Sequence, residues 1–210
     1  MLIVREMQYS EAATRRLLPY FQQKNLAFPP HAITMAFFKH EKRMELYAAG
    51  ADQVMMPIRS YPLLGISGHL GPKLREGDGQ VPEGGYRIVH LNPMSAFHLS
   101  LKLDYPNSFD REQALVEKRD SLGDNIMIHG GNQSVGCLAI GNEAIEEIFI
   151  LTQFVGMERV NVLVAPIDFR AGHPWPVGQP VVKSSFSDQL YRNLAAQLAL
   201  LPPPAPPSPG

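Results

Sequence analysis

Short apolar runs rich in β-branched and aromatic residues recur from residue 33 onward, and charged or glycine-containing turns separate them. Runs of this length and composition predict strands, and the closely spaced ones predict an antiparallel meander. The predicted strands are Ile33–Phe38, Glu45–Ala48, Gln53–Ile58, Tyr86–Leu91, Ala96–Leu103, Asn125–His129 and Val160–Val164. We therefore expect a β-rich α+β fold built on a mixed sheet or sandwich.

Three further segments have helical spacing and are expected at the periphery of the sheet. The first runs from Ser10 to about Asn25, where Ser10 can cap the helix and Pro19 should kink or shorten it. The second is Asn142–Phe154, with Asn142 as its expected N-cap. The third, Ser187–Leu201, is predicted to be a closing amphipathic helix.

The length and composition predict one main domain. A chain of 210 residues, of which 45% are hydrophobic, can bury one core. We expect an N-terminal helical segment over 1–32, the main domain over 33–201, and a Pro-rich tail over 202–210 that forms neither helix nor sheet. Residues 67–85 form a long Gly-rich loop, a kind of loop that is usually functional or mobile.

The charge balance and the apolar stretches limit the partners that we expect. With 19 Lys and Arg against 20 Asp and Glu, no nucleic-acid partner is expected. Stretches such as Ile145–Val155 fall short of the roughly 20 apolar residues of a membrane span. The first residues lack the pattern of a secretory signal, so either a signal was removed or export takes another route. A single cysteine excludes an intramolecular disulfide.

One segment combines the groups that nucleophilic catalysis requires. His129 ends a predicted strand, and the only cysteine, Cys137, follows eight residues later. A nearby imidazole can take the proton of a thiol and so activate it as a nucleophile. Gly136 leaves the backbone N–H groups around Cys137 unobstructed, which makes them a candidate oxyanion hole. The structural alternative is a buried cysteine beside an ordinary His-Gly turn.

The motifs in and before this segment resemble a known family. His129-Gly130, Ser134-x-Gly136-Cys137 and Asn142 resemble the catalytic signature of the L,D-transpeptidase (YkuD-type) family. The resemblance extends from about Phe37 to Asp168. Four upstream segments are similar to the YafK-like branch of that family: 67–73, 76–86, 92–100 and 105–107.

The resemblance implies the family's fold, with residues 33–201 as the catalytic domain, and a cysteine-dependent acyl transfer on peptidoglycan stem peptides at diaminopimelate. Cys137 would form a thioester with the substrate, and His129 would act as the base. The backbone carbonyl of Gly130 would orient His129. Backbone amides around Gly136 and Cys137 would stabilise the oxyanion. No cofactor is implied, and a periplasmic location follows from the substrate.

Stem peptides are anionic, so cationic and polar side chains are candidate substrate contacts. Lys73, with Arg75 and Arg59, could receive substrate carboxylates, and a solvated charged loop is the alternative. His98 lies on a predicted strand, where a substrate contact and a core histidine are equally expected.

Two further residues and one acidic cluster complete the candidates. Ser134 and Tyr86 stand within the resembling motifs and are taken as substrate contacts. Glu76-Gly77-Asp78 has no His or Cys ligand spacing nearby, so we expect no metal site.

Two positions depart from the Ser-His-Gly-Cys-x-Arg pattern of many members. Val135 stands in place of the second His, and Ala139 in place of the Arg. This favours hydrolysis or amide exchange, including release of a peptidoglycan-linked lipoprotein, over cross-linking. The alternatives are a non-catalytic peptidoglycan-binding module and a secreted effector that attacks a rival's wall.

Overall fold

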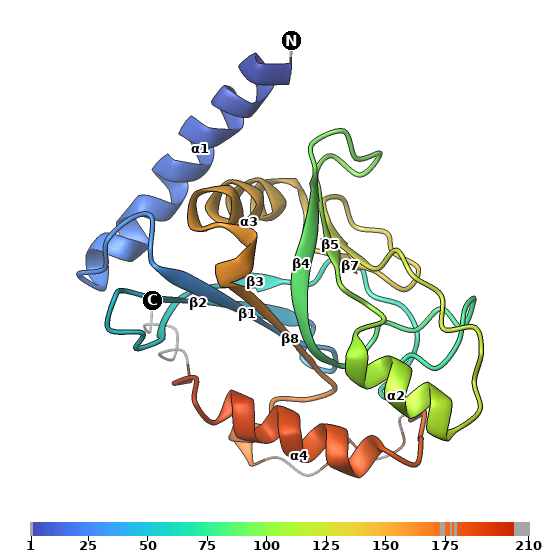
Figure 1. Cartoon of the computed structure of the whole chain (residues 1–210). Helices are drawn as coiled ribbons and strands as arrows, with labels where there is room; N and C mark the ends of the chain where they lie inside the picture. The colour runs from blue at the N-terminus through green and yellow to red at the C-terminus, as the bar shows by residue number, and fades with distance from the viewer. Residues whose placement is uncertain (1, 173–174, 177, 179, 204–210) are drawn as a thin grey trace.

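The computed structural model describes residues 2–172, 175, 176, 178 and 180–203 (Figure 1). The strands are β1 (Ala32–Phe38), β2 (Arg43–Ala49), β3 (Met56–Pro62), β4 (Gly84–Asn92), β5 (Ser100–Leu103), β6 (Met127–His129), β7 (Leu138–Ala139) and β8 (Val160–Ala165). The helices are α1 (Leu2–Gln23), α2 (Ser108–Val116), α3 (Asn142–Val155) and α4 (Ser187–Leu198). The expected β-rich α+β fold is confirmed.

The strands form one mixed sheet in the order β3-β2-β1-β8-β4-β5-β6-β7. The first three strands make the predicted antiparallel meander. The late strand β8 then inserts between β1 and β4, parallel to the first and antiparallel to the second. The far edge, formed by β5, β6 and β7, carries the segment that contains His129 and Cys137.

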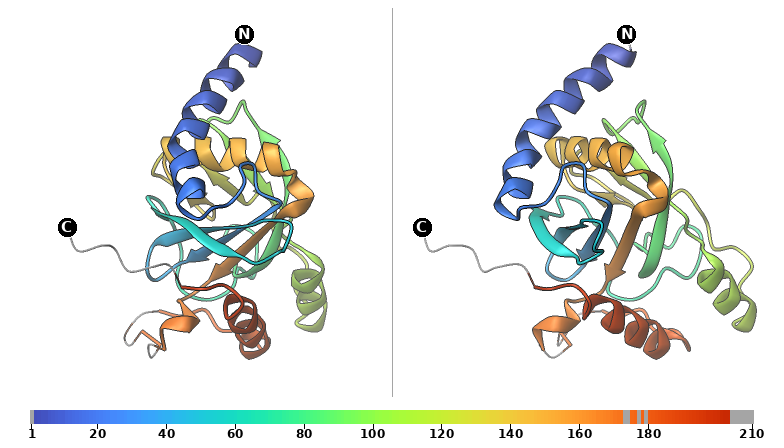
Figure 2. Two further views of the ribbon diagram at one scale, coloured as in Figure 1. Left: turned by 90° about the vertical axis from the view of Figure 1, so that its left-hand side faces the viewer. Right: turned by 60° about the vertical axis from the view of Figure 1, so that its left-hand side comes forward.

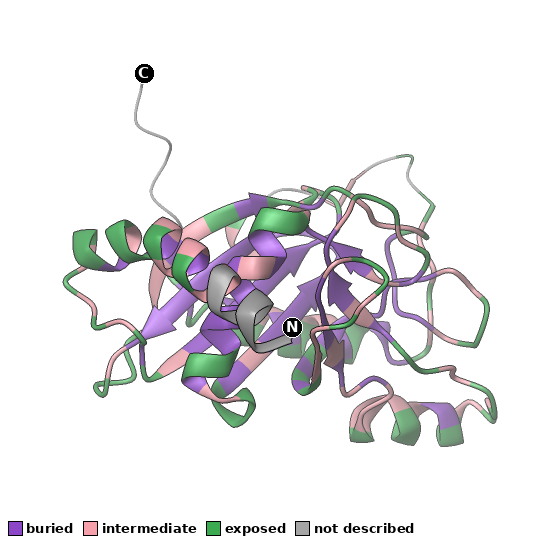
Figure 3. Ribbon diagram, turned by 90° about the horizontal axis from the view of Figure 1, so that it is seen from above, coloured by how far each residue is buried: buried purple, intermediate pink, exposed green. Residues whose placement is uncertain are grey.

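The sheet half formed by β1, β2 and β8 is buried on both faces, because strand residues alternate in direction. Ile33, Met35 and Phe37 of β1 belong to the core beneath α1 and α3. Their neighbours Ala36 and Phe38 belong to a second cluster that α4 covers. Figure 2 shows α1 and α3 on one side of the strands and α4 on the other, and Figure 3 shows the strands buried between them.

The first helix begins earlier than predicted, and Pro19 does not shorten it. It begins at Leu2 instead of near Ser10, and it continues through Pro19 to Gln23. A proline inside a helix removes one backbone hydrogen bond, but Leu17 and Phe21 on either side of Pro19 are fully buried. Their burial holds the helix together, and the proline lies on its exposed side.

Other boundaries also move. β3 begins at Met56, after a turn in which Gln53 has a positive φ of 59°, and β5 begins at Ser100 instead of Ala96. The short elements α2 and β7 were not predicted. Gly141, not Asn142, is the N-cap of α3. The closing helix ends at Leu198, and of the Pro-rich tail only Pro202 and Pro203 belong to the described residues.

The long Gly-rich loop between β3 and β4 is tied down by buried charges. The Lys39 ammonium lies 2.9 Å from Glu83 Oε1, and both side chains are almost completely buried. Within the loop, the Asp78 carboxylate accepts hydrogen bonds from the backbone N–H groups of Leu74, Arg75 and Gln80. These contacts hold the loop in one conformation against the rest of the fold.

Candidate active site

An open cavity of about 460 Å³ lies on the edge half of the sheet, at β5, β6 and the segment before β7. His129, Cys137 and Ser134 all line it, so the structure brings together three of the predicted site residues. The other lining residues are Asn92, Ser95, Phe97, Ser100, Asn125, Met127, Gln133 and Val135.

The register of the parallel strands β6 and β7 explains why the imidazole and the thiol share this cavity. Ile128 pairs with Leu138, and His129 pairs with Ala139. Continuing the register by one residue places Cys137 beside Met127, whose N–H donates to Cys137 Sγ at 3.4 Å. Because side chains alternate between faces, Cys137 and His129 point to the same face of the sheet.

His129 is held in the orientation that a general base requires. Its Nδ1 lies 2.7 Å from the carbonyl oxygen of Gly130. Since a carbonyl can only accept, Nδ1 carries the proton and Nε2 keeps its lone pair. The Phe97 ring lies 4.7 Å from the imidazole, centre to centre. Burial lowers the pKa of His129, only partly opposed by the bond to Gly130, so the ring is neutral at neutral pH.

Cys137 is a protonated thiol in this resting arrangement. Burial raises its pKa, while the Met127 N–H and the positive charge of Lys73 act in the opposite direction. The Sγ–H points toward the carbonyl oxygen of Asn125, at a distance of 3.7 Å. The site therefore holds a neutral thiol and a neutral imidazole, and the proton must move when the thiol attacks a substrate.

The two amides expected to form an oxyanion hole already have partners. Gly136 N–H donates to Ser67 Oγ at 2.7 Å, and Cys137 N–H donates to Ser134 Oγ at 3.0 Å. An oxyanion must replace or share these hydroxyl contacts. Ser67, which was predicted only as part of a motif, thereby connects the Gly-rich loop to the residue before Cys137.

Gly130 and Asn142 have packing roles that fix the loop after His129. A Cβ built on Gly130 would lie 2.7 Å from the Phe97 carbonyl oxygen and 2.8 Å from Asn142 Oδ1. Glycine is thus the residue that fits there. Asn142 Oδ1 accepts the N–H of Gly131 at 2.9 Å, so its amide braces this loop instead of capping α3 as predicted.

The structure places Arg59 and His98 away from the cavity, contrary to expectation. Arg59 donates to the buried carboxylate of Glu147 and lies over the Tyr61 ring. His98 lies within the connection between β4 and β5 with a positive φ of 76°, and its Nε2 lies 2.8 Å from Glu146 Oε1. Both residues connect the sheet to α3.

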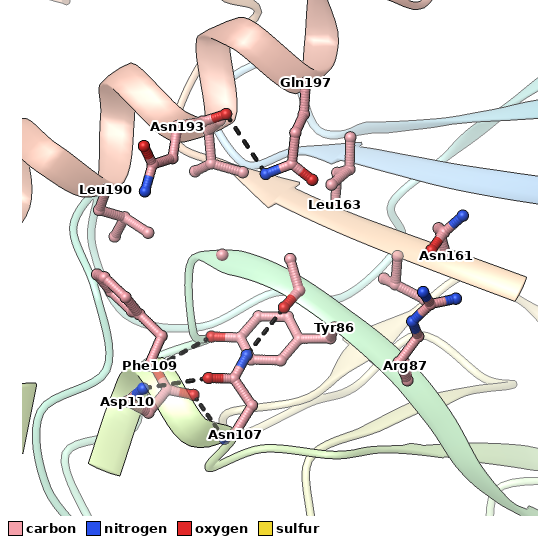
Figure 4. A pocket seen from close by; sticks show the side chains of 14 residues that line it. Tyr86, Arg87, Asn107, Phe109, Asp110, Asn161, Leu163, Leu190, Asn193 and Gln197 are labelled. Carbon is pink, nitrogen blue, oxygen red and sulfur yellow. Dashed lines mark hydrogen bonds between the residues drawn. The ribbon is translucent and has the colours of Figure 1, made fainter. Parts of the chain in front are cut away.

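Tyr86 is also outside the cavity of Cys137. It lies against a separate pocket of about 300 Å³ between β4, β8, α2 and α4 (Figure 4). Its hydroxyl donates to the Glu83 carbonyl oxygen at 3.2 Å and faces Asp110 at 3.5 Å. The residue is almost completely buried.

Lys73 is not the solvent-exposed loop charge that we expected. Its Nζ lies 2.7 Å from Asp78 Oδ1 and donates to the Arg75 carbonyl oxygen, and 6% of the side chain is exposed. Arg75 itself lines a different hollow. Lys73 instead stabilises the Gly-rich loop and acts on Cys137 through its charge.

Sequence reasoning missed several polar lining residues, including Asn92, Ser95 and Ser100. The signal was present, since all three lie in the resembling segment 92–100. Within the described residues, no group of three or more His, Cys, Asp or Glu side chains is arranged to hold a metal ion. No described helix is long and apolar enough to cross a membrane.

The fold agrees with the comparisons. The chain belongs to the YkuD family, the L,D-transpeptidase catalytic domain, which it matches over residues 36–182. It is 32% identical over 165 residues to proteins named "Putative L,D-transpeptidase YafK" from Escherichia coli K12 and O157:H7. The matched part is 75% of this chain and 62% of each relative, so the chain spans less than two thirds of their length.

Solved structures support the same fold. The crystal structure of the helical cell shape determining protein Pgp2 from Campylobacter jejuni superposes with a TM-score of 0.51, 24% identity, and coverage of 63% of this chain and 47% of that one. A variant of Pgp2 gives a TM-score of 0.52 at 21% identity, covering 81% and 55%. At these identities the likeness concerns the fold alone.

Proposed function

We propose that this protein is a cysteine-dependent acyl-transfer enzyme that acts on peptidoglycan stem peptides at diaminopimelate. The observation that carries the proposal is the pairing of Cys137 and His129 on one face of the cavity, with His129 Nδ1 fixed by Gly130 and Nε2 left to accept a proton. Family membership makes peptidoglycan the expected substrate. The location that fits this substrate is the periplasm.

The chemistry has two halves. His129 Nε2 takes the thiol proton as Cys137 Sγ attacks the carbonyl of the stem peptide, and the tetrahedral oxyanion is stabilised by the N–H groups of Gly136 and Cys137. The C–N bond breaks, the leaving amine takes the proton from His129, and a thioester remains. An amine or a water molecule then attacks the thioester while His129 takes its proton, and the thiol is regenerated.

We favour water or an exchanging amine over a cross-linking acceptor. Ala139, in place of the Arg of many members, is fully buried. Its backbone exchanges two hydrogen bonds with Gly65, and an alanine side chain has no cationic group that could hold an acceptor. The acceptor must therefore be positioned by other groups. Release of a peptidoglycan-linked lipoprotein fits this reaction direction.

The test is incubation of the purified protein with sacculi, followed by mass spectrometry of the products. Cys137→Ala should release no product, and Cys137→Ser very little, because an alcohol is a far weaker nucleophile beside the same imidazole. Turnover in Cys137→Ala would reject the mechanism. No turnover by the unmodified protein would favour the peptidoglycan-binding module instead.

Defined muropeptides then separate the reaction directions. Disaccharide-tetrapeptides and protein-linked muropeptides are supplied together, and cross-linked dimers are counted against cleaved monomers. Hydrolysis or exchange predicts mainly cleaved species. Abundant dimer without cleavage of the protein-linked species would establish cross-linking in its place.

A further inference from the structure

The cavity of Cys137 has no acidic or basic lining residue apart from His129 and Cys137 themselves. An anionic peptide bound there must find its cation next to the cavity. Arg59 and Lys73 are held in ion pairs with Glu147 and Asp78. The strand register identifies a different lysine.

The strands β5, β6 and β7 bring Lys102 onto the face that carries the nucleophile. Lys102 pairs with Met127, and Ser100 pairs with His129. Residues directly opposite each other on paired strands point to the same face. Lys102, Met127 and Cys137 therefore form one row across the strands, beside the row of Ser100, His129 and Ala139. The alternate residues Leu101 and Leu103 are buried in the core.

Side-chain contacts place the Lys102 ammonium near the sulfur. Lys102 Nζ donates to Asn125 Oδ1 at 2.7 Å. The backbone carbonyl of the same Asn125 lies 3.7 Å from Cys137 Sγ, and Asn125 lines the cavity. A single residue therefore separates the ammonium from the nucleophile.

The partner of this ammonium is neutral. A lysine has three donors, and the carboxamide of Asn125 uses one of them. Among the described residues, no carboxylate lies within ion-pair distance of Lys102, whereas Lys39 and Lys73 are each paired with one. The same carboxamide donates to Asp124 Oδ1, so the Asp124 carboxylate reaches Lys102 only through this amide, and the other two donors of Lys102 have no partner within the described residues.

We propose that Lys102 is the carboxylate-binding residue of this site and makes it selective for peptides that carry a free carboxylate near the attacked carbonyl. Two strand spacings separate Lys102 from Cys137, which sets the distance from carbonyl to carboxylate at roughly 10 Å or less. The inference rests on the proposed function for the identity of the ligand as a stem peptide. Lys102 thus supplies a positive charge in a site where Ala139 stands in place of the arginine of many members.

The test measures binding, so that it does not depend on turnover. In the Cys137→Ala background, the dissociation constants of two matched stem tetrapeptides are measured by calorimetry at low salt. One peptide carries the diaminopimelate carboxylate, and in the other that group is a carboxamide. The carboxylate peptide should bind roughly tenfold more tightly, as expected for a charged hydrogen bond.

Variants assign this preference to the ammonium. Lys102→Met keeps the aliphatic stem and should abolish the preference, Lys102→Arg should retain it, and Lys102→Glu should reverse it. Lys183→Met, an exposed lysine before α4, is the control for net charge and should leave the preference unchanged. Thermal unfolding of each variant confirms that it is folded.

The outcomes separate the inference from the proposed function. Equal binding of the two peptides, or a preference that survives Lys102→Met, overturns the role of Lys102. Lys102-dependent binding without turnover on sacculi rejects the proposed enzyme and leaves the carboxylate site standing. Turnover on sacculi without Lys102-dependent binding supports the proposed enzyme and rejects the carboxylate site at Lys102.

Discussion

On the helix-covered half of the sheet, the Glu147 carboxylate is fully buried and accepts hydrogen bonds from Arg16, Arg59 and Tyr61. On the cavity half, the Lys102 ammonium meets only a carboxamide, and His129 Nε2 has no partner within the described residues. A buried charge without a partner is costly, and the Glu147 carboxylate has three partners. On the cavity half, the hydrogen-bonding capacity that Lys102 and His129 Nε2 do not use within the protein is available to a ligand.

The largest effect should come from the base. His129→Ala should lower the rate of product release from sacculi by about 10²- to 10⁴-fold, because no other group in the cavity can take the thiol proton. The free energy of unfolding should change little in comparison. The exposed His31 offers a control, and His31→Ala should keep the full rate. A normal rate in His129→Ala would mean that another residue is the base.

Glu147 should show the opposite behaviour. Glu147→Ala leaves Arg59 and the Tyr61 hydroxyl without their acceptor and Arg16 with Glu146 as its remaining carboxylate, and should lower the free energy of unfolding by about 3 kcal/mol. Urea unfolding measures this loss, and the rate per folded molecule should stay near that of the parent protein. Glu143→Ala, an exposed carboxylate on the same helix, should change stability by less than about 0.5 kcal/mol. Equal losses in the two variants would contradict a matched buried cluster.

The protonation state of the resting site gives a third prediction. Burial raises the pKa of Cys137 and lowers that of His129, so alkylation by iodoacetamide should be slow at pH 7 and rise on the alkaline side. Because folding raises the pKa of Cys137, the neutral thiol is the form that the folded protein favours. Any contribution of this thiol to the free energy of unfolding is present at low pH and is lost as the pH rises through the pKa of the folded protein. A plateau of reactivity below pH 7 would instead indicate a thiolate–imidazolium pair.

Lys73 should have the smallest effect on the nucleophile. Lys73→Met removes a positive charge that lowers the pKa of Cys137, so that pKa should rise further. Alkylation at pH 8 should slow by roughly twofold at low ionic strength, and by less in salt, because a charge that acts over a distance is screened. A stronger effect on peptide affinity than on alkylation would return Lys73 to the role of a substrate contact.

The sequence predicted the elements whose pattern is local. The meander β1–β3 and the helix α3 were found because their apolar spacing repeats within a few residues, as in Ile33, Met35 and Phe37. The helix α2 was missed because Ala114 is its only buried residue, so it has no apolar stripe. Its signal was the capping box of Asn107 and Asp110. The strand β7 has two residues, too few for any pattern.

The shared cavity of His129 and Cys137, the proposed catalytic pair, was predictable for the same reason, since the two residues lie close in sequence within a specific motif. The positions of the cationic side chains were not predictable, because pairing between distant segments decides where a cation points. Lys73 pairs with Asp78 and Arg59 with Glu147, while strand register places Lys102 in the same row as Cys137, two strands away. How 1–32 and 33–201 divide as domains stays a prediction.

The connection between the parallel strands β6 and β7 is short and has no helix, although parallel neighbours usually need a dozen or more residues to connect. One residue more or fewer between Gly130 and Gly136 would shift the second strand by one register position and turn Cys137 toward the core. A substitution in this segment changes one side chain and keeps the register of β7, so the fold can accommodate it. A change of its length cannot, so an engineered or evolved variant has to keep the spacing before it keeps the residues.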